Sequence, residues 1–90
     1  MGKKILLVDD DESLRDSLAE QLELHEEFEP KGAGTAKEGL DLLEKECFDV
    51  ILLDVGLPDM DGRTACRLMR RNGVKSPIVM LTSSDTEVDF

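Results

Sequence analysis

Aspartates gather directly after two apolar runs of the chain, and this crowding is the first sign of chemistry in the sequence. Asp9-Asp10-Asp11 follows the aliphatic run at residues 4–8, and Asp54 follows the run at residues 48–53. Carboxylates repel one another and resist transfer out of water, so placing them against apolar segments is unfavourable. A chain that does this twice is expected to build a site for a cation, for phosphoryl chemistry, or for both.

Oxygen ligands of this kind select a hard cation. Mg²⁺ is the best match, because it binds carboxylates, keeps several waters and pairs with phosphate, whereas Ca²⁺ lacks the support of an EF-hand spacing. A carboxylate beside Mg²⁺ can also attack phosphorus and form an aspartyl phosphate. Asp54 is the better nucleophile because it stands alone after the most apolar run, while Asp9 and Asp10 are placed to reach a metal. Thr82 follows another apolar run, where its hydroxyl could meet a phosphoryl oxygen.

The elements that would position these residues alternate between short apolar runs and helical periods, which predicts βαβ units around a parallel sheet. The expected strands are 4–8, 28–33, 50–53 and 77–81, and the expected helices are 11–24, one capped by Thr35, and one with an apolar stripe at 65–69. Pro30 favours an edge position for the second strand. The order βαβαβαβ indicates an α/β fold of the flavodoxin type, in which ligands bind where the strand order reverses, between the first and third strands.

Simpler interpretations of the same residues stay open. Asp9, Asp10 and Asp11 also suit the first turn of a helix, where negative charge is favourable. Asp54 would then be a loop residue, and Thr82 an ordinary polar residue that ends a strand. Both acidic groups, however, follow the two strands that flank the expected reversal of strand order, and this coincidence favours a functional site.

Composition narrows the function further. The 90 residues suit one small domain, with 40% hydrophobic and 36% charged residues and a formal net charge of −10. This charge opposes nucleic-acid binding by the segment. No apolar run is long enough to span a membrane and the start does not read as a signal peptide, so we expect a cytoplasmic protein without membrane contact. His25 is the only histidine, and Cys47 and Cys66 are too far apart for a Cys-x-x-Cys site, so neither histidine catalysis nor zinc binding is favoured.

Three segments carry a resemblance to the receiver domain of two-component response regulators. Residues 8–11 resemble the acidic pair that follows the first strand of this family. Residues 52–62, Leu-Leu-Asp-Val-Gly-Leu-Pro-Asp-Met-Asp-Gly, are very similar to its phosphoacceptor segment and form the specific match. Residues 81–83 resemble the segment with the switch hydroxyl. The resemblance covers residues 3–90 and implies a CheY-like, three-layer α/β fold.

The resemblance also implies roles for individual residues. Asp54 would be the phosphoacceptor, and Mg²⁺ would be held by Asp9, Asp10, Asp54 and the backbone carbonyl of Gly56. Thr82 would be the hydroxyl that moves toward the phosphoryl group. The donor would be a histidine kinase or a histidine phosphotransfer protein. The domain would take part in a phosphorelay and would not be an enzyme, any self-phosphorylation or self-dephosphorylation being intrinsic.

Members of this family continue through a further helix, strand and helix, and the strand is followed by a lysine that contacts the phosphoryl group. We therefore expect residues 1–90 to be a receiver domain truncated at its C-terminus, with a helix that opens near Asp85 and stops after one turn. The strand at 77–81 would be an exposed edge, and the bare face would favour a homodimer or a swapped oligomer. Phosphoryl transfer would be impaired more than metal binding. Any DNA-binding output would belong to a parent protein.

Two alternatives compete with the signalling function. One is a self-associating regulator fragment without signalling competence. The other is a phosphatase with an aspartyl nucleophile, which would have a second acid two residues after the nucleophile, where this chain has Gly56. Nucleotide binding has no support, because neither a Gly-x-Gly-x-x-Gly pattern nor a P-loop occurs.

Overall fold

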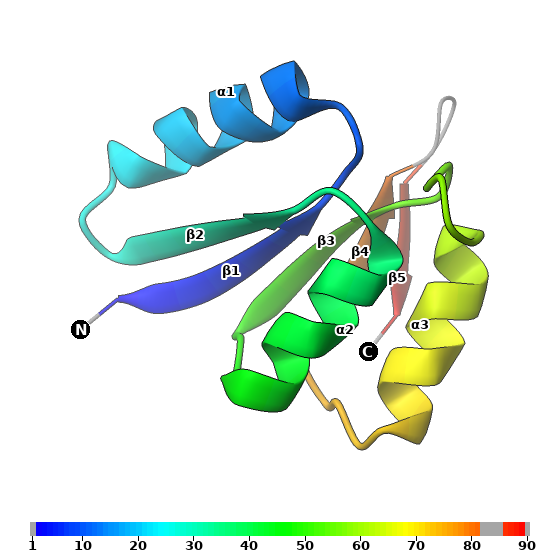
Figure 1. The fold of residues 1–90 in the computed structure, drawn as a ribbon. Coiled ribbons are helices and arrows are strands. Elements are labelled where there is room, and N and C mark those ends of the chain that lie inside the picture. The colour runs from blue at the N-terminus through cyan, green and yellow to red at the C-terminus, as the bar shows by residue number, and fades with distance from the viewer. Residues whose placement is uncertain (1, 82–85, 90) are drawn as a thin grey trace.

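The computed structural model describes residues 2–81 and 86–89, and in them the chain forms one sheet with helices on both faces (Figure 1). The strands are β1 (Lys3–Val8), β2 (Phe28–Ala33), β3 (Val50–Asp54), β4 (Ile78–Leu81) and β5 (Thr86–Asp89). The helices are α1 (Glu12–Glu23), α2 (Ala36–Lys45) and α3 (Gly62–Arg71). The strand order is β2-β1-β3-β4-β5, with β1 to β4 parallel, so the flavodoxin-type order expected from the sequence is confirmed.

The direction of each crossover decides which face a helix covers. The chain steps outward from β1 to β2 and then back across β1 to β3 and β4. Because βαβ connections are right-handed, α1 lies on one face and α2 and α3 lie on the other. Figure 1 shows α1 on one face of the sheet and α2 and α3 on the other. On that second face α2 packs on β1 and β2 and against α3, and α3 packs on β3 and β4. Among the described residues, no helix is both long and apolar enough to cross a bilayer.

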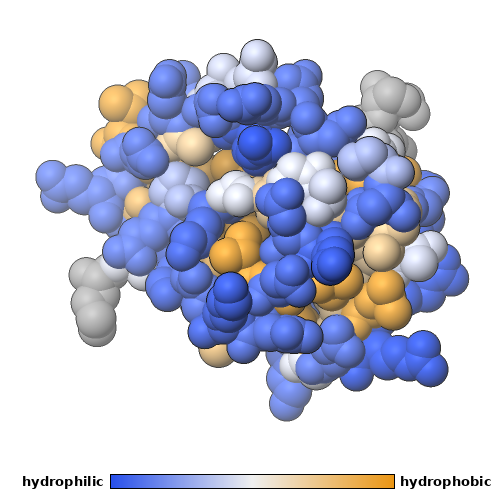
Figure 2. All heavy atoms as spheres, in the orientation of Figure 1, coloured by the Kyte–Doolittle hydropathy of each residue, from blue (hydrophilic) through white to orange (hydrophobic). Residues whose placement is uncertain are grey.

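The core lies between the sheet and the pair α2 and α3. The inward-facing strand residues are fully or almost fully buried, and small or flexible side chains of the two helices complete the cluster. Its strand members are Leu6, Val8, Ile51, Leu53, Ile78 and Met80, and its helix members include Ala36, Ala65 and Met69. In Figure 2, hydrophilic side chains cover most of the visible face, and apolar surface shows through where α2 and α3 lie side by side.

The opposite face of the sheet is less well covered. Along β3 and β4 the residues that alternate with the core are only half-buried, and they are Val50, Leu52, Val79 and Leu81. The apolar stripe expected on α1 is also poorly buried. No residue of α1 is buried, and Leu14 is 44% exposed. The reason is that α1 packs on β1 and β2, near one edge of the sheet, and leaves the face over β3 and β4 without a helix.

The end of the chain differs from the expectation. Residues 86–89 form β5, which pairs antiparallel with β4 from Leu81↔Thr86 to Ile78↔Asp89. The helix predicted from Asp85 is therefore wrong for these residues, and Asp85 itself lies outside the described residues. A single helical turn is costly to nucleate, whereas pairing satisfies the outer backbone groups of β4. The prediction that β4 is the sheet edge is also wrong, and self-association stays a prediction that light scattering would test.

Neighbouring leucines in β3 test the difference between the two faces. Leu53 is fully buried between the sheet and the helix pair, whereas Leu52 points to the half-covered face. We expect Leu53→Ala to lower the free energy of unfolding by about 2–5 kcal/mol. Leu52→Ala should cost only about 1 kcal/mol, because it removes fewer contacts. Urea unfolding followed by circular dichroism measures both, and equal losses would show that the two faces are equally well packed.

Candidate metal centre

The acids singled out in the sequence meet at one edge of the sheet. Asp9 and Asp10 follow β1, and Asp54 is the last residue of β3. The two strands are parallel neighbours, and the register Val8↔Leu53 brings Asp9 level with Asp54. One carboxylate oxygen from each of Asp9, Asp10 and Asp54 lies within 4.8 Å of the other two. The strand order reverses between β1 and β3, so the cluster occupies the position where open α/β sheets bind ligands.

Asp9 is the buried member of this cluster, with 8% of its surface exposed. Its backbone is held on both sides, because its N–H donates to the Ala33 carbonyl at 3.0 Å and its own carbonyl accepts from Arg15 Nη1 at 2.6 Å. Its Oδ1 accepts a hydrogen bond from the Asp11 N–H at 2.9 Å. These contacts keep the Asp9 carboxylate in one place at the end of β1.

Within residues 2–81, no recorded ion pair involves a carboxylate of the cluster. Burial raises the pKa of Asp9 above its ordinary value, and the neighbouring carboxylates raise it further, against the opposing effect of the Asp11 N–H. The ion pairs recorded among residues 2–81 join Glu46 to Lys4 and Lys31, at the other end of β1 and β2. Crowded oxygen donors, one of which (Asp9) has a raised pKa, fit a hard cation such as Mg²⁺, which would lower the repulsion between them.

Asp54 is half-buried and begins a loop that folds back on itself. Its Oδ1 accepts a long hydrogen bond, 3.3 Å, from the Gly56 N–H. The Gly62 N–H donates to the Val55 carbonyl at 2.8 Å and closes the base of the loop. A glycine is required at position 62, because a Cβ there would lie 2.7 Å from the Cα of Val55. Leu57 is buried in the core, so the loop after Asp54 is anchored from inside.

Thr82, the predicted switch hydroxyl, lies outside the described residues. Its neighbour Leu81 ends β4 and pairs with Asp54, and the Leu81 carbonyl accepts from the Val55 N–H at 3.3 Å. The strand expected to carry the hydroxyl therefore ends beside the acidic cluster. The structure brings Asp9, Asp10 and Asp54 together and places the residue before Thr82 next to them.

One contact of this loop was not predicted from the sequence, and it is made by Asp59, within the segment at residues 52–62. The Asp59 carboxylate accepts from the N–H groups of Ala36 and Lys37, each at 3.0 Å. The loop after β3 is thereby tied to the first turn of α2. No sequence pattern points to this contact, because its partners are 23 and 22 residues away along the chain.

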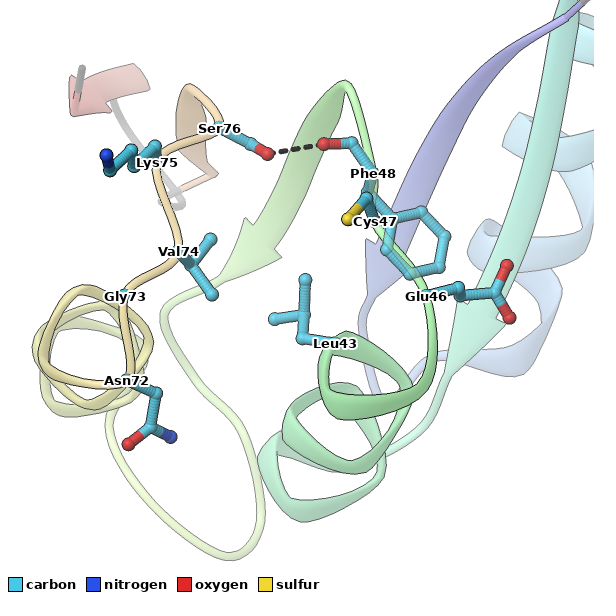
Figure 3. Close-up of a pocket in the computed structure, with 9 residues that line it drawn as sticks. All are labelled: Leu43, Glu46, Cys47, Phe48, Asn72, Gly73, Val74, Lys75 and Ser76. Atoms are coloured by element: carbon cyan, nitrogen blue, oxygen red, sulfur yellow. Dashed lines mark hydrogen bonds between the residues drawn. The ribbon is translucent and has the colours of Figure 1, made fainter.

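A pocket of about 310 Å³ lies at the opposite end of the sheet, between the segments that lead into β3 and β4 (Figure 3). Leu43, Phe48 and Val74 line it, and a hydrogen bond from the Ser76 hydroxyl to the Phe48 carbonyl closes one side. None of Asp9, Asp10 and Asp54 lines this pocket. The candidate site is therefore the surface cluster of carboxylates and not this cavity.

Comparison with known proteins gives a consistent result. The model of a family described as the response regulator receiver domain matches residues 5–90. The alkaline phosphatase synthesis transcriptional regulatory protein PhoP of Bacillus subtilis is 42% identical over 89 residues, which are 99% of this chain. The matched segment is 37% of the length of that relative.

Solved structures share the fold. The receiver domain of the Francisella response regulator 1452 is 26% identical with a TM-score of 0.86, and the match covers 93% of this chain and 69% of that one. The response regulator TrrA of Thermotoga maritima, solved in complex with Mg²⁺-BeF, is 30% identical with a TM-score of 0.81. That match covers 90% of this chain and 70% of TrrA.

The raised pKa of Asp9 leads to a pH prediction for the metal-free protein. Because the pKa is higher in the folded state, the folded state binds the proton more tightly, and stability falls as the pH rises from the ordinary aspartate pKa through the raised one. Asp9→Asn removes this penalty and keeps the oxygen that accepts from Asp11. We expect Asp9→Asn to be more stable than the parent at pH 7 and the difference to shrink below pH ~4.

Urea unfolding with a chelator present, repeated across this pH range, measures the effect. Adding Mg²⁺ at pH 7 should stabilise the parent chain more than Asp9→Asn, because the variant lacks one anionic ligand. A parent chain that is more stable than Asp9→Asn at every pH would contradict the predicted repulsion.

Proposed function

This chain belongs to the response regulator receiver domain family, and from this premise we propose that it accepts a phosphoryl group on Asp54 in an Mg²⁺-dependent reaction. Receiver domains are signalling domains that accept phosphoryl groups from histidine kinases. The observation that carries the proposal is the cluster in which oxygens of Asp9, Asp10 and Asp54 lie within 4.8 Å of one another. The proposed role is transfer of a signal rather than turnover of a substrate.

The proposed metal ligands are the carboxylates of Asp9, Asp10 and Asp54 and the backbone carbonyl of Gly56. Their support is the oxygen-only chemistry of the cluster and the pKa of Asp9, which burial raises first and the neighbouring carboxylates raise further. When bound, Mg²⁺ supplies positive charge that neutralises the phosphoryl oxygens. The solved relative TrrA, which carries Mg²⁺-BeF, supports the same ligand class here.

In the proposed step, a carboxylate oxygen of Asp54 attacks the phosphorus of a phosphohistidine. The new P–O bond forms as the P–N bond breaks, and the electron pair of that bond stays on the imidazole nitrogen of the donor. The donor is a histidine kinase or a histidine phosphotransfer protein. The hydrogen bond from the Gly56 N–H to Asp54 Oδ1 limits rotation of the carboxylate, which favours attack from one orientation.

Thr82 is proposed to donate its hydroxyl to an oxygen of the transferred group. The support is indirect, since it comes from Leu81, the preceding residue, which pairs with Asp54. Self-phosphorylation from a small phosphodonor such as acetyl phosphate would use the same residues, because the donor needs only a good leaving group. The PhoP relative is named a transcriptional regulatory protein, but the match covers 37% of it, so we propose only the phosphoryl-accepting role for these ninety residues.

Acetyl phosphate labelling followed by intact-protein mass spectrometry tests the proposal. We expect one phosphoryl group per chain in the presence of Mg²⁺, no label with a chelator, and no label in Asp54→Asn. The label should be removed by hydroxylamine, because an acyl phosphate reacts with this nucleophile. Asp49→Asn is a matched control, since Asp49 precedes β3 at the other end of the sheet and should leave labelling unchanged.

Label that persists in Asp54→Asn, or that forms equally well without Mg²⁺, would contradict the proposal. The rate carries further information. If a longer receiver domain with the lysine after its fifth parallel strand labels faster but binds Mg²⁺ equally well, the expectation that transfer is impaired more than metal binding is confirmed.

A further inference from the structure

Asp59 makes a contact that its exposed position in the loop between β3 and α3 does not suggest. Its Oδ1 accepts from the Ala36 N–H and its Oδ2 from the Lys37 N–H, each at 3.0 Å. These hydrogen bonds, from Ala36 first, lower the pKa of Asp59, so the side chain stays ionised and suits the positive end of the α2 dipole. The carboxylate is thus a bidentate cap supplied to α2 by a distant loop.

Two side chains cap different N–H groups in the first turn of α2. The first N–H groups of a helix have no intrahelical partner. Thr35 provides the local cap, because its Oγ1 accepts from the Glu38 N–H at 3.1 Å. The Asp59 carboxylate accepts hydrogen bonds from the N–H groups of Ala36 and Lys37. Two side chains therefore cap the same helix end, but only Asp59 connects that end to the loop that follows Asp54.

The loop needs such a connection because packing does not hold its metal-facing part. Gly56 is exposed, and a Cβ built on it would have no atom within 4 Å. Its position is set by the flanks of the loop. Gly62 closes the base through the Val55 carbonyl, Leu57 is buried in the core, and Asp59 holds the tip. Without the Asp59 contact, the remaining anchors would be the base of the loop with its Gly56–Asp61 bridge, and the packing of Leu57 and Met60 on the core.

The segment that leads into α2 is hydrogen-bonded to the backbone of Asp9. The Asp9 N–H donates to the carbonyl of Ala33, three residues before Ala36. Further along α2, Gly39 lies so close to β1 that a Cβ on it would be 3.0 Å from Val8 Cγ2. The start of α2 therefore has a fixed place relative to Asp9. By bonding to it, Asp59 ties the loop of Asp54 to the strand end of Asp9.

We propose that Asp59 is a positioning residue, which caps α2 from the loop after β3 and thereby holds the Gly56 backbone in place for the metal. The inference rests on the proposed function, in which the Gly56 carbonyl is a metal ligand. Asp59 itself is not one of the proposed ligands of the metal or of the phosphoryl group. It acts through the loop, as residues that orient metal ligands do.

Two alanine variants separate positioning from simple capping. Asp59→Ala and Thr35→Ala each remove a cap from the same helix end, but only the first releases the loop. We expect Asp59→Ala to weaken Mg²⁺ binding about tenfold, the low end of the effect of residues that orient metal ligands. Thr35→Ala should leave Mg²⁺ affinity unchanged. Isothermal titration with MgCl₂ measures both, with circular dichroism to confirm that each variant is folded. Asp59→Asn, which keeps one acceptor oxygen, should fall between the parent and Asp59→Ala.

A metal-free readout makes the inference separable from the proposed function. Amide hydrogen exchange at Gly56 and Gly62 should accelerate in Asp59→Ala and stay unchanged in Thr35→Ala. Equal effects of the two alanine variants on exchange, or no effect of Asp59→Ala, would overturn the positioning role. If the parent chain binds no Mg²⁺, the proposed function fails, and the exchange result still decides whether Asp59 positions the loop.

Discussion

The mutual repulsion of Asp9, Asp10 and Asp54 is the constraint around which the rest of the structure is arranged. The register of β1 against β3 brings the acids level, and the same register sets which side chains enter the core. A slip of one residue would turn Leu6 and Val8 away from α2 and α3. The core therefore enforces a close approach of charges that the acids alone would avoid. Burial of Asp9 at the end of β1 increases this cost and is the main cause of its raised pKa.

Most of this arrangement could be predicted from the sequence, because it follows from local patterns. Aliphatic runs predicted the strands β1, β3 and β4. The acids that follow β1 and end β3 predicted that Asp9, Asp10 and Asp54 lie together, since parallel strands present their carboxyl ends at one edge. The strand formed by residues 86–89 could not be predicted from local patterns. Their pairing with β4 depends on an open strand edge elsewhere in the chain, whereas Ser84 and Asp85 carry a local signal for a helix cap. The long-range pairing prevailed, since a single helical turn is too costly to nucleate.

The hydrogen bonds of Asp59 to α2 could not be predicted for a related reason. In the sequence it is one of several turn formers between Gly56 and Gly62, and local rules explain it fully as such. Its hydrogen bonds to Ala36 and Lys37 form only because the fold brings the loop after β3 next to the start of α2. Contacts between a loop side chain and a distant backbone leave no periodic trace in the sequence. They are nevertheless the contacts that set how loops sit at the carboxyl end of a sheet.

The two faces of the sheet support the site unequally. The layer of α2 and α3 shares the main core with β1, β3 and the buried Leu57, so the acids and the loop after Asp54 are fixed from this side. Helix α1 buries no residue and would contribute little, except for Arg15. The Arg15 guanidinium donates to the Asp9 carbonyl, and its side chain also passes close to Gly32, where a Cβ would meet it at 2.9 Å. Because this cation is bonded to a main-chain oxygen, it steadies the end of β1 without occupying the carboxylate of Asp9. Among residues 2–81, the recorded ion pairs do not include these carboxylates, which agrees with the metal-binding role proposed for them.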